Sequence, residues 1–151
     1  MNKTGAGRLL TLAAFLETLP RSVFDIERWA GVRYCGGSAY MPASLRLPSK
    51  RGRKGITPAE MRSCGAAACA LGWAATIEPL AGRGLRINKQ DFPEYSGLIG
   101  YDAGALFFGI SLRESEFLFS PNKYSKNPSP KTVAKRIRAL CDKAGWVEAA
   151  A

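Results

Sequence analysis

Apolar residues recur at helical spacing near both ends of the sequence, and this pattern limits the fold more than any other feature. Residues 4–19 form the first such stripe, with Thr4 as the expected N-cap and Pro20 ending the pattern. Residues 130–144 form the second stripe, and Pro130 stands in its first turn, where a missing backbone N–H costs nothing. The sequence therefore predicts an amphipathic helix at each end, each with an apolar face that must be covered.

Two inner segments are apolar on nearly every side and predict buried helices. Residues 65–77 are rich in alanine and almost uncharged. Residues 103–110, AGALFFGI, follow Asp102, which is the expected N-cap of the second buried helix. Ser111 and Glu114 then have the spacing of a capping box, which predicts the start of a further short helix.

These patterns predict a single compact domain over residues 1–151 that is all-α or nearly so. We expect about five helices, the amphipathic ones clasping the buried ones, and at most a small β element at residues 85–87. Residues 91–95 are expected to form a loop. Residues 31–58 are rich in glycine, proline, serine and basic residues, which predicts a long irregular basic loop. A chain of 151 residues can bury a core without a disulfide or a metal.

The sequence contains no histidine, and this absence excludes several chemistries. Ser-His-Asp and Cys-His catalysis and histidine-containing zinc sites all require one. The four cysteines, at positions 35, 64, 69 and 141, form no C-x-x-C pair, so we expect reduced thiols, no metal and no cofactor. No apolar run reaches the roughly 18 residues of a membrane span, and the N-terminal apolar stretch lacks a signal-peptide cleavage site. We therefore expect no membrane association and a cytoplasmic location.

The stretch CGAAACALGWAA holds two cysteines in a run of small residues. If both lie on one helix, Cys64 and Cys69 are rotated by about 140° from each other and can share neither a disulfide nor a metal ion. Cys69 is expected to be a buried packing residue, and Cys69→Ser to destabilise the fold because a buried hydroxyl needs a partner. Cys64 is a candidate nucleophile, since a nearby helix N-terminus and Arg62 would both lower its thiol pKa. Without histidine, its base would have to be a carboxylate or a lysine.

The formal net charge of +10 is concentrated in two segments, 44–62 and 123–143, which carry +5 and +6. In the second segment, Lys131, Lys135 and Arg138 follow i, i+4, i+7 spacing and are expected to project into solvent opposite the apolar face. One interpretation is an ordinary solvated helix face. The other is a surface for an acidic partner, with the loop and the helix tracking phosphates together. The residues predicted for that surface are Lys50, Arg51, Arg53, Lys54, Lys131, Lys135, Arg136 and Arg138.

The aromatic residues divide into two groups. The phenylalanines of the apolar segments, Phe117 among them, are expected in the core. Tyr34, Tyr40 and Tyr124 stand in loops near basic residues and are candidates to stack on nucleic-acid bases.

Six stretches of the chain, taken in order, resemble a family of small uncharacterised proteins carried by bacteriophages, prophages and plasmids. They are LLTLAAFLETLP, FDIERW, CGAAACALGWAA, ALFFGI, LFSPNKY and SPKTVAKRIRAL. Proteins of that family share an L-A-x-F-L helix, F-D-x-x-x-W, a C-G-T-x-x-C-x-x-G-W-A core and a closing T-P-x-x-V-A-x-R-I helix. This chain differs in having Ala66 where the family often has threonine, and in a basic insertion at 46–54. The resemblance implies mobile-element biology in a bacterial host cell and no mechanism.

Three functions are compatible with the sequence. The leading hypothesis is a non-enzymatic mobile-element accessory protein that binds nucleic acid or a host nucleoprotein complex through its basic surface. Its biological form would be interference with a host defence system, as by an anti-CRISPR protein; this part rests on the resemblance alone. The second is a small cysteine-dependent enzyme or thiol-based ligand binder centred on Cys64, and the third is an adaptor for an acidic protein partner.

Overall fold

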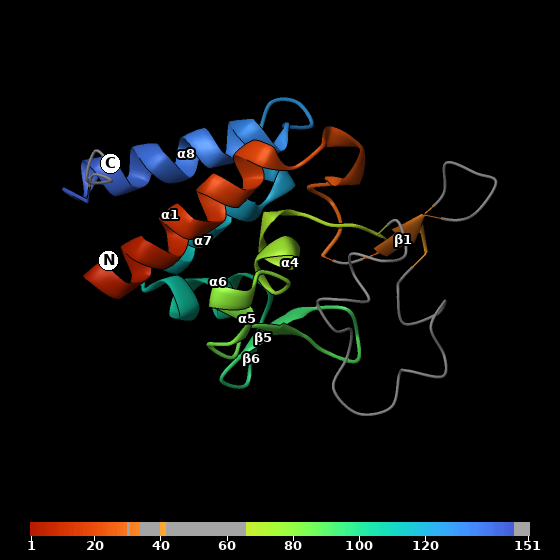
Figure 1. The fold of residues 1–151 in the computed structure, drawn as a ribbon, viewed down its shortest axis with the longest axis horizontal. Helices are drawn as coiled ribbons and strands as arrows, with labels where there is room; N and C mark the ends of the chain where they lie inside the picture. The colour runs from red at the N-terminus through yellow and green to blue at the C-terminus, as the bar shows by residue number, and fades with distance from the viewer. Residues whose placement is uncertain (30, 34–39, 42–65, 147–151) are drawn as a thin grey trace.

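The computed structural model describes residues 1–29, 31–33, 40–41 and 66–146 (Figure 1). Helices dominate this part of the chain. They are α1 (Lys3–Thr18), α4 (Ala70–Ala74), α5 (Glu78–Ala81), α6 (Gly100–Phe108), α7 (Leu112–Phe119) and α8 (Pro130–Lys143), with 3-10 turns η1 (Arg21–Val23) and η3 (Pro121–Lys123). The expectation of a mostly helical protein is confirmed. None of the described helices is long and apolar enough to cross a membrane.

Short strands make up a larger β part than expected. Two three-stranded antiparallel sheets are present in the described residues, in the orders β2-β1-β3 and β4-β5-β6. The strands are β1 (Gly31–Arg33), β2 (Tyr40–Met41), β3 (Ala66–Ala67), β4 (Arg86–Ile87), β5 (Pro93–Tyr95) and β6 (Leu98–Ile99). Two of them, β1 and β2, fall in the segment predicted to be irregular, and the rest of the predicted basic loop lies outside the described residues.

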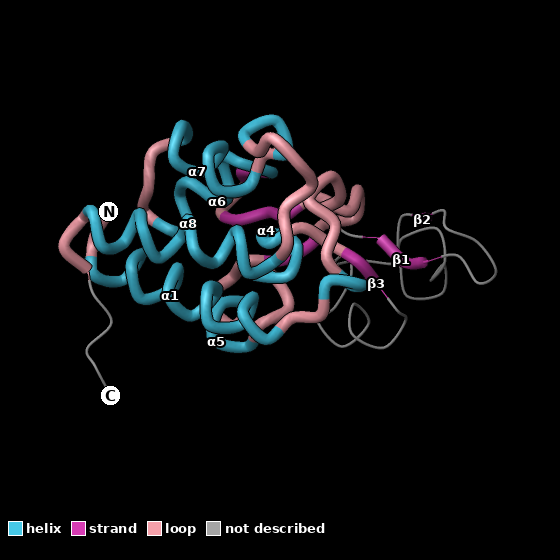
Figure 2. The backbone as a smooth tube through the Cα atoms, turned by 90° about the horizontal axis from the view of Figure 1, so that it is seen from above, coloured by secondary structure: helices cyan, strands magenta, loops and turns pink. Residues whose placement is uncertain are grey.

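Helices α1 and α8 lie side by side and form one layer of the molecule (Figures 1 and 2). Leu9, Leu12 and Leu16 of α1 are fully buried, as are Val133 and Ile137 of α8. Burying a leucine side chain contributes roughly 1.5–3 kcal/mol, so this apolar seam is a major part of the core. The two amphipathic helices expected from the sequence are thus confirmed, and they cover each other.

Capping side chains explain where the helices begin. The N-cap of the first helix is Asn2, two residues before the expected Thr4, and its side chain accepts a hydrogen bond from the backbone N–H of Gly5 (2.8 Å). Helix α6 starts at Gly100, whose φ of +61° suits glycine, so Asp102 lies inside the first turn and is not the cap. The capping box of Ser111 and Glu114 is confirmed at the start of α7.

The single buried helix predicted over 65–77 is wrong. Residues 66–67 form strand β3, and the helix that follows, α4, covers only Ala70–Ala74. The reason is a set of backbone hydrogen bonds with distant residues: Asp25 donates to the carbonyl of Ala68, and Cys69 donates to the carbonyl of Arg28. Alanine fits a strand or a helix sterically, so long-range pairing decides the outcome here.

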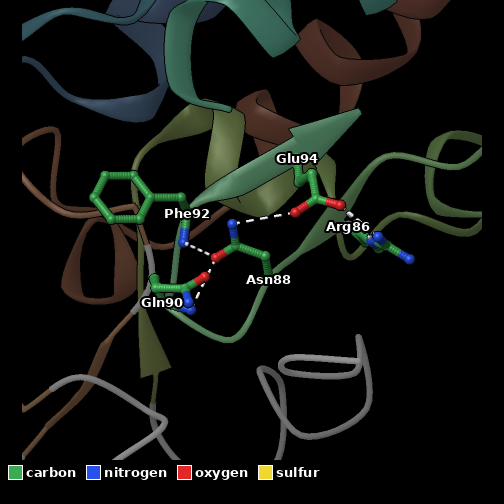
Figure 3. A network of polar contacts seen from close by, with 5 residues as sticks. All are labelled: Arg86, Asn88, Gln90, Phe92 and Glu94. Carbon is green, nitrogen blue, oxygen red and sulfur yellow. Dashed lines mark hydrogen bonds and ion pairs between the residues drawn. The ribbon is translucent and has the colours of Figure 1, made fainter. Parts of the chain in front are cut away.

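The β4–β5 hairpin is held by its own polar side chains (Figure 3). The Asn88 side chain accepts hydrogen bonds from the backbone N–H groups of Gln90 and Phe92 and donates one to Glu94. Glu94 also pairs with Arg86 across the two strands, and this partner lowers the pKa of Glu94. The predicted strand at 85–87 is confirmed at Arg86–Ile87, whereas the predicted loop at 91–95 contains strand β5.

Candidate binding site between helices α7 and α8

The predicted basic residues divide into three groups in the structure. Lys131 and Lys135 are exposed on α8 and form no ion pair with a described residue, whereas Arg136 and Arg138 are partly buried. The predicted loop cations Lys50, Arg51, Arg53 and Lys54 lie outside the described residues. The proposal that this loop and α8 share one surface therefore stays a prediction.

Arg138 does not project freely into solvent as expected. Its Nε and a terminal nitrogen donate to the two carboxylate oxygens of Glu17 on α1, at 2.7 and 2.9 Å. This pairing lowers the pKa of Glu17. Of the predicted stripe of Lys131, Lys135 and Arg138, one member therefore contacts α1. Arg138 forms an ion pair that links α8 to α1.

Arg136, which is rotated about 100° around the helix from Lys135, lies on the other flank of α8. Its guanidinium donates to the backbone carbonyl of Phe117 (2.9 Å) and stands 4.5 Å from the centre of the Phe117 ring and 3.6 Å from that of Tyr124. Cation–π contacts of this kind contribute about 0.5–1 kcal/mol at exposed sites. Arg136 is thus held in one orientation against α7.

Tyr124 is committed to the fold rather than open to a base. Its hydroxyl donates to the carbonyl of Leu118 (2.7 Å), one ring face is covered by Arg136, and burial raises its pKa to about 12. Tyr34 lies outside the described residues, and so does the side chain of Tyr40. The predicted stacking role is therefore not supported for Tyr124.

Phe117 is exposed, contrary to the expectation that it belongs to the core. Its side chain is 44% exposed, whereas Phe107, Phe108 and Phe119 are buried. The residues Phe117, Leu118 and Phe119 span about 200° of a helix, so an amphipathic helix cannot bury all three against one neighbour. This spacing is the signal in the sequence that would have identified Phe117 as the exposed member.

Between α7 and α8 the surface forms a groove with a volume of about 550 Å³, the α7–α8 groove. Its aromatic wall is Phe117, and its cations are Arg113, Arg136 and Lys143. Glu114 also lines it, but its carboxylate accepts hydrogen bonds from the backbone N–H and the hydroxyl of Ser111. The groove therefore presents three cations beside one carboxylate that is already engaged in a helix cap.

A second hollow of about 340 Å³ also has Arg136 in its lining. It is lined by Tyr124 and Thr132 and by the cations Arg21 and Lys126, and its described lining residues include no aspartate or glutamate. Arg136 lines both hollows. We call the resulting set the cationic strip, and it consists of Arg113, Lys143, Arg136, Lys126 and Arg21.

The described cysteines are buried and poorly suited to nucleophilic chemistry. Cys69 is the N-cap of α4 and is 1% exposed; its sulfur accepts a hydrogen bond from the N–H of Gly72, and burial raises its pKa to about 12. Burial also raises the pKa of Cys141. Cys64 lies outside the described residues, and the helix expected to begin beside it begins at Ala70. No group of three or more His, Cys, Asp or Glu residues within the described ranges is placed to hold a metal ion.

Comparison with known proteins does not assign the chain to a group. No family model matches the sequence, and no curated protein or solved structure shows significant similarity to it. The function therefore has to be inferred from the features of the chain itself.

Proposed function

We propose that this protein is a non-enzymatic nucleic-acid-binding protein that uses the cationic strip to contact phosphates. The observation that carries the proposal is the charge of the strip: two hollows share Arg136 in their linings, and five cations line them. Arginine and lysine side chains arranged along a groove match the regular charges of a nucleic-acid backbone. The sequence resemblance adds a biological setting, that of a mobile-element accessory protein directed at a host defence complex.

The strip is suited to binding because its central cation is fixed in advance. Arg136 is restrained by a backbone acceptor and two aromatic rings, so little side-chain freedom is lost when an anion binds beside it. Arg113 and Lys143 are exposed at the edge of the α7–α8 groove and add the long-range attraction that speeds encounter with an anionic partner.

Charge reversal in the strip tests the proposal. We expect Arg113→Glu/Lys143→Glu to weaken the binding of fluorescein-labelled DNA and to flatten the slope of log K against log salt by nearly one unit for each phosphate that the variant no longer neutralises. The matched control is Arg83→Glu/Lys89→Glu, which changes the net charge equally at exposed positions outside the strip. It should alter affinity and slope much less.

The flank of α8 that faces α1 gives a second comparison. Lys131→Glu/Lys135→Glu should have an effect between those of the strip variant and the control, since both lysines lie on α8 but line neither hollow. Equal reductions in affinity in all three variants would show that net charge alone attracts DNA, and would overturn the strip as the binding site. Absence of DNA binding by the wild-type protein, together with binding to polyglutamate, would assign the strip to an acidic protein partner instead.

A further inference from the structure

The exposed ring of Phe117 stands among the cations of the α7–α8 groove, and the fold makes only partial use of it. Its ring contacts Arg136, yet 44% of the side chain stays exposed to solvent. The phenylalanines on either side of it in sequence, Phe107, Phe108 and Phe119, are buried. An aromatic ring in a groove between cations offers a ligand both an apolar surface and charge neutralisation.

We propose that the α7–α8 groove is a stacking site for an unpaired base, so that the preferred partner is single-stranded nucleic acid. In this arrangement a base lies against the Phe117 ring, and Arg113 and Lys143 contact the phosphates on either side of it. The inference rests on the proposed function and names the class of nucleic acid that the same strip takes.

The occupant is single-stranded because only an unpaired base presents its flat face. In a duplex each base face is covered by the next base pair, and an aromatic side chain inside a groove cannot reach it. The volume of about 550 Å³ lies within the range of sites that enclose small ligands, which is large enough for a nucleoside. An extended single strand also suits the groove, because it presents bases together with phosphates, and Phe117 lines the groove together with Arg113, Arg136 and Lys143.

Contacts with Arg136 restrain the Phe117 ring before a ligand binds. Arg136 lies 4.5 Å from the ring centre and donates to the Phe117 carbonyl, which restrains both side chains before any ligand binds. A base stacked on the Phe117 ring therefore gains contact area at little cost in side-chain entropy. A duplex or an extended acidic peptide would meet the same cations but would gain nothing from a planar aromatic wall.

Substitutions at Phe117 with a labelled oligothymidylate as the probe test the inference. Stacking contributes roughly 1–3 kcal/mol per base, so Phe117→Ala should weaken binding by about tenfold or more. Phe117→Leu keeps an apolar side chain but no aromatic face, and should weaken binding nearly as much. Phe117→Trp should bind at least as tightly as wild type. None of the three should change the salt slope, since every cation that faces a phosphate is retained.

Tryptophan at this position also provides a direct signal. In Phe117→Trp, fluorescence should be quenched when oligothymidylate binds, because the base stacks on the indole. The control is Leu106→Trp, which places a tryptophan on α6 at a site 51% exposed and outside the groove, and which should show no added quenching. Thermal unfolding of each variant verifies that the fold is retained.

The outcomes separate this inference from the proposed function. If the strip variants lose DNA binding but Phe117→Ala and Phe117→Leu bind as wild type, the stacking site is wrong and the strip stands. A duplex of matched sequence and charge that binds as tightly as the single strand would also overturn the stacking site. Failure of the wild-type protein to bind any DNA or RNA would refute both.

Discussion

Arg138, in the second half of α8, makes an ion pair with Glu17, near the end of α1, through two hydrogen bonds. The two distances are 2.7 and 2.9 Å, and the residues are 121 positions apart in sequence. Glu17 and Arg138 are both partly exposed, with side-chain exposures of 41% and 28%, so solvent screens the pair and its contribution is modest.

The first prediction concerns this pair. Glu17→Gln and Arg138→Gln should each lower the free energy of unfolding by about 0.5–1 kcal/mol, and the double variant should cost no more than either alone. Arg138→Glu should cost more because it places two carboxylates together. Urea unfolding measures these values, with Lys135→Glu as the control that leaves stability nearly unchanged. Additive effects in the double variant would show that the residues act independently.

The second prediction concerns acid stability at the start of α7. Hydrogen bonds from Ser111 lower the pKa of Glu114 below its ordinary value of 4.5. Because the folded-state pKa is the lower one, the stabilisation is fully present above pH 4.5 and is lost as the pH falls from there through the folded pKa. Glu114→Gln should therefore destabilise the protein at pH 7 and have a smaller effect in acid. Urea titrations across pH measure this, and an equal effect of Glu114→Gln at pH 7 and in acid would contradict it.

The third prediction reverses an expectation from the sequence. The sequence alone predicts that Cys69→Ser destabilises the fold for lack of a partner, but the Cys69 sulfur accepts the N–H of Gly72 and caps α4. Serine is a preferred N-cap residue, so Cys69→Ser should keep this bond. Cys69→Val, which has no acceptor, should be less stable than Cys69→Ser by about 1 kcal/mol. Equal stability of the two variants in urea would show that the cap contributes nothing.

Thiol chemistry gives the fourth prediction. In a Cys35→Ser/Cys64→Ser background, only Cys69 and Cys141 remain, and both are buried with raised pKa values. Ellman's reagent at pH 8 should modify neither until urea unfolds the chain, and the reaction should follow the unfolding transition. Fast reaction of the folded protein would mean that one of these thiols is accessible.

The fifth prediction compares two glycines on α1. A side chain at Gly5 would collide with the backbone carbonyl of Phe108, whereas a side chain at Gly7 would meet open space. Gly5→Ala should therefore destabilise the protein by about 1–3 kcal/mol, since α1 and α6 must separate. Gly7→Ala should stabilise it by up to about 1 kcal/mol through helix propensity. Thermal or urea unfolding distinguishes the two signs.

The elements with strong local signals are predictable. The starts of α7 and α8 can be predicted from a few neighbouring residues, namely the capping box of Ser111 and Glu114 and the proline at 130. Both helices begin as predicted. The segment around Ala67 and strand β5 are not predictable in this way. Ala66 and Ala67 pair with Val32 and Gly31, far away in sequence, so no local pattern encodes those partners. Strand β5 instead pairs with its neighbours β4 and β6, and the sequence does not predict it because Asp91 and Pro93 are typical of a loop.

The candidate site is predictable only in part. The cluster of charges on the last helix identifies Arg136 as a candidate binding residue. The i, i+4, i+7 spacing, however, predicts that Lys131, Lys135 and Arg138 form the main binding surface. Which flank of α8 is open depends on where α1 and α7 lie, and the sequence of α8 does not contain that information. Sequence reasoning assigns Phe117 to the core because an apolar residue in an apolar run is the usual core candidate, and only its angular position around the helix separates it from Leu118 and Phe119.

The packing of α1 against α8 has a consequence for how the chain acquires its structure during synthesis. The leucine face of α1 leaves the ribosome first, but the helix that covers it is made only after some hundred further residues, as the separation of 121 between Glu17 and Arg138 shows. Until then α1 is covered only in part, by α4, α5 and α6. Contacts between such distant segments slow folding because a long loop must close before they form. The nascent chain therefore needs either a temporary partner for α1 or fast completion of α8 to avoid aggregation.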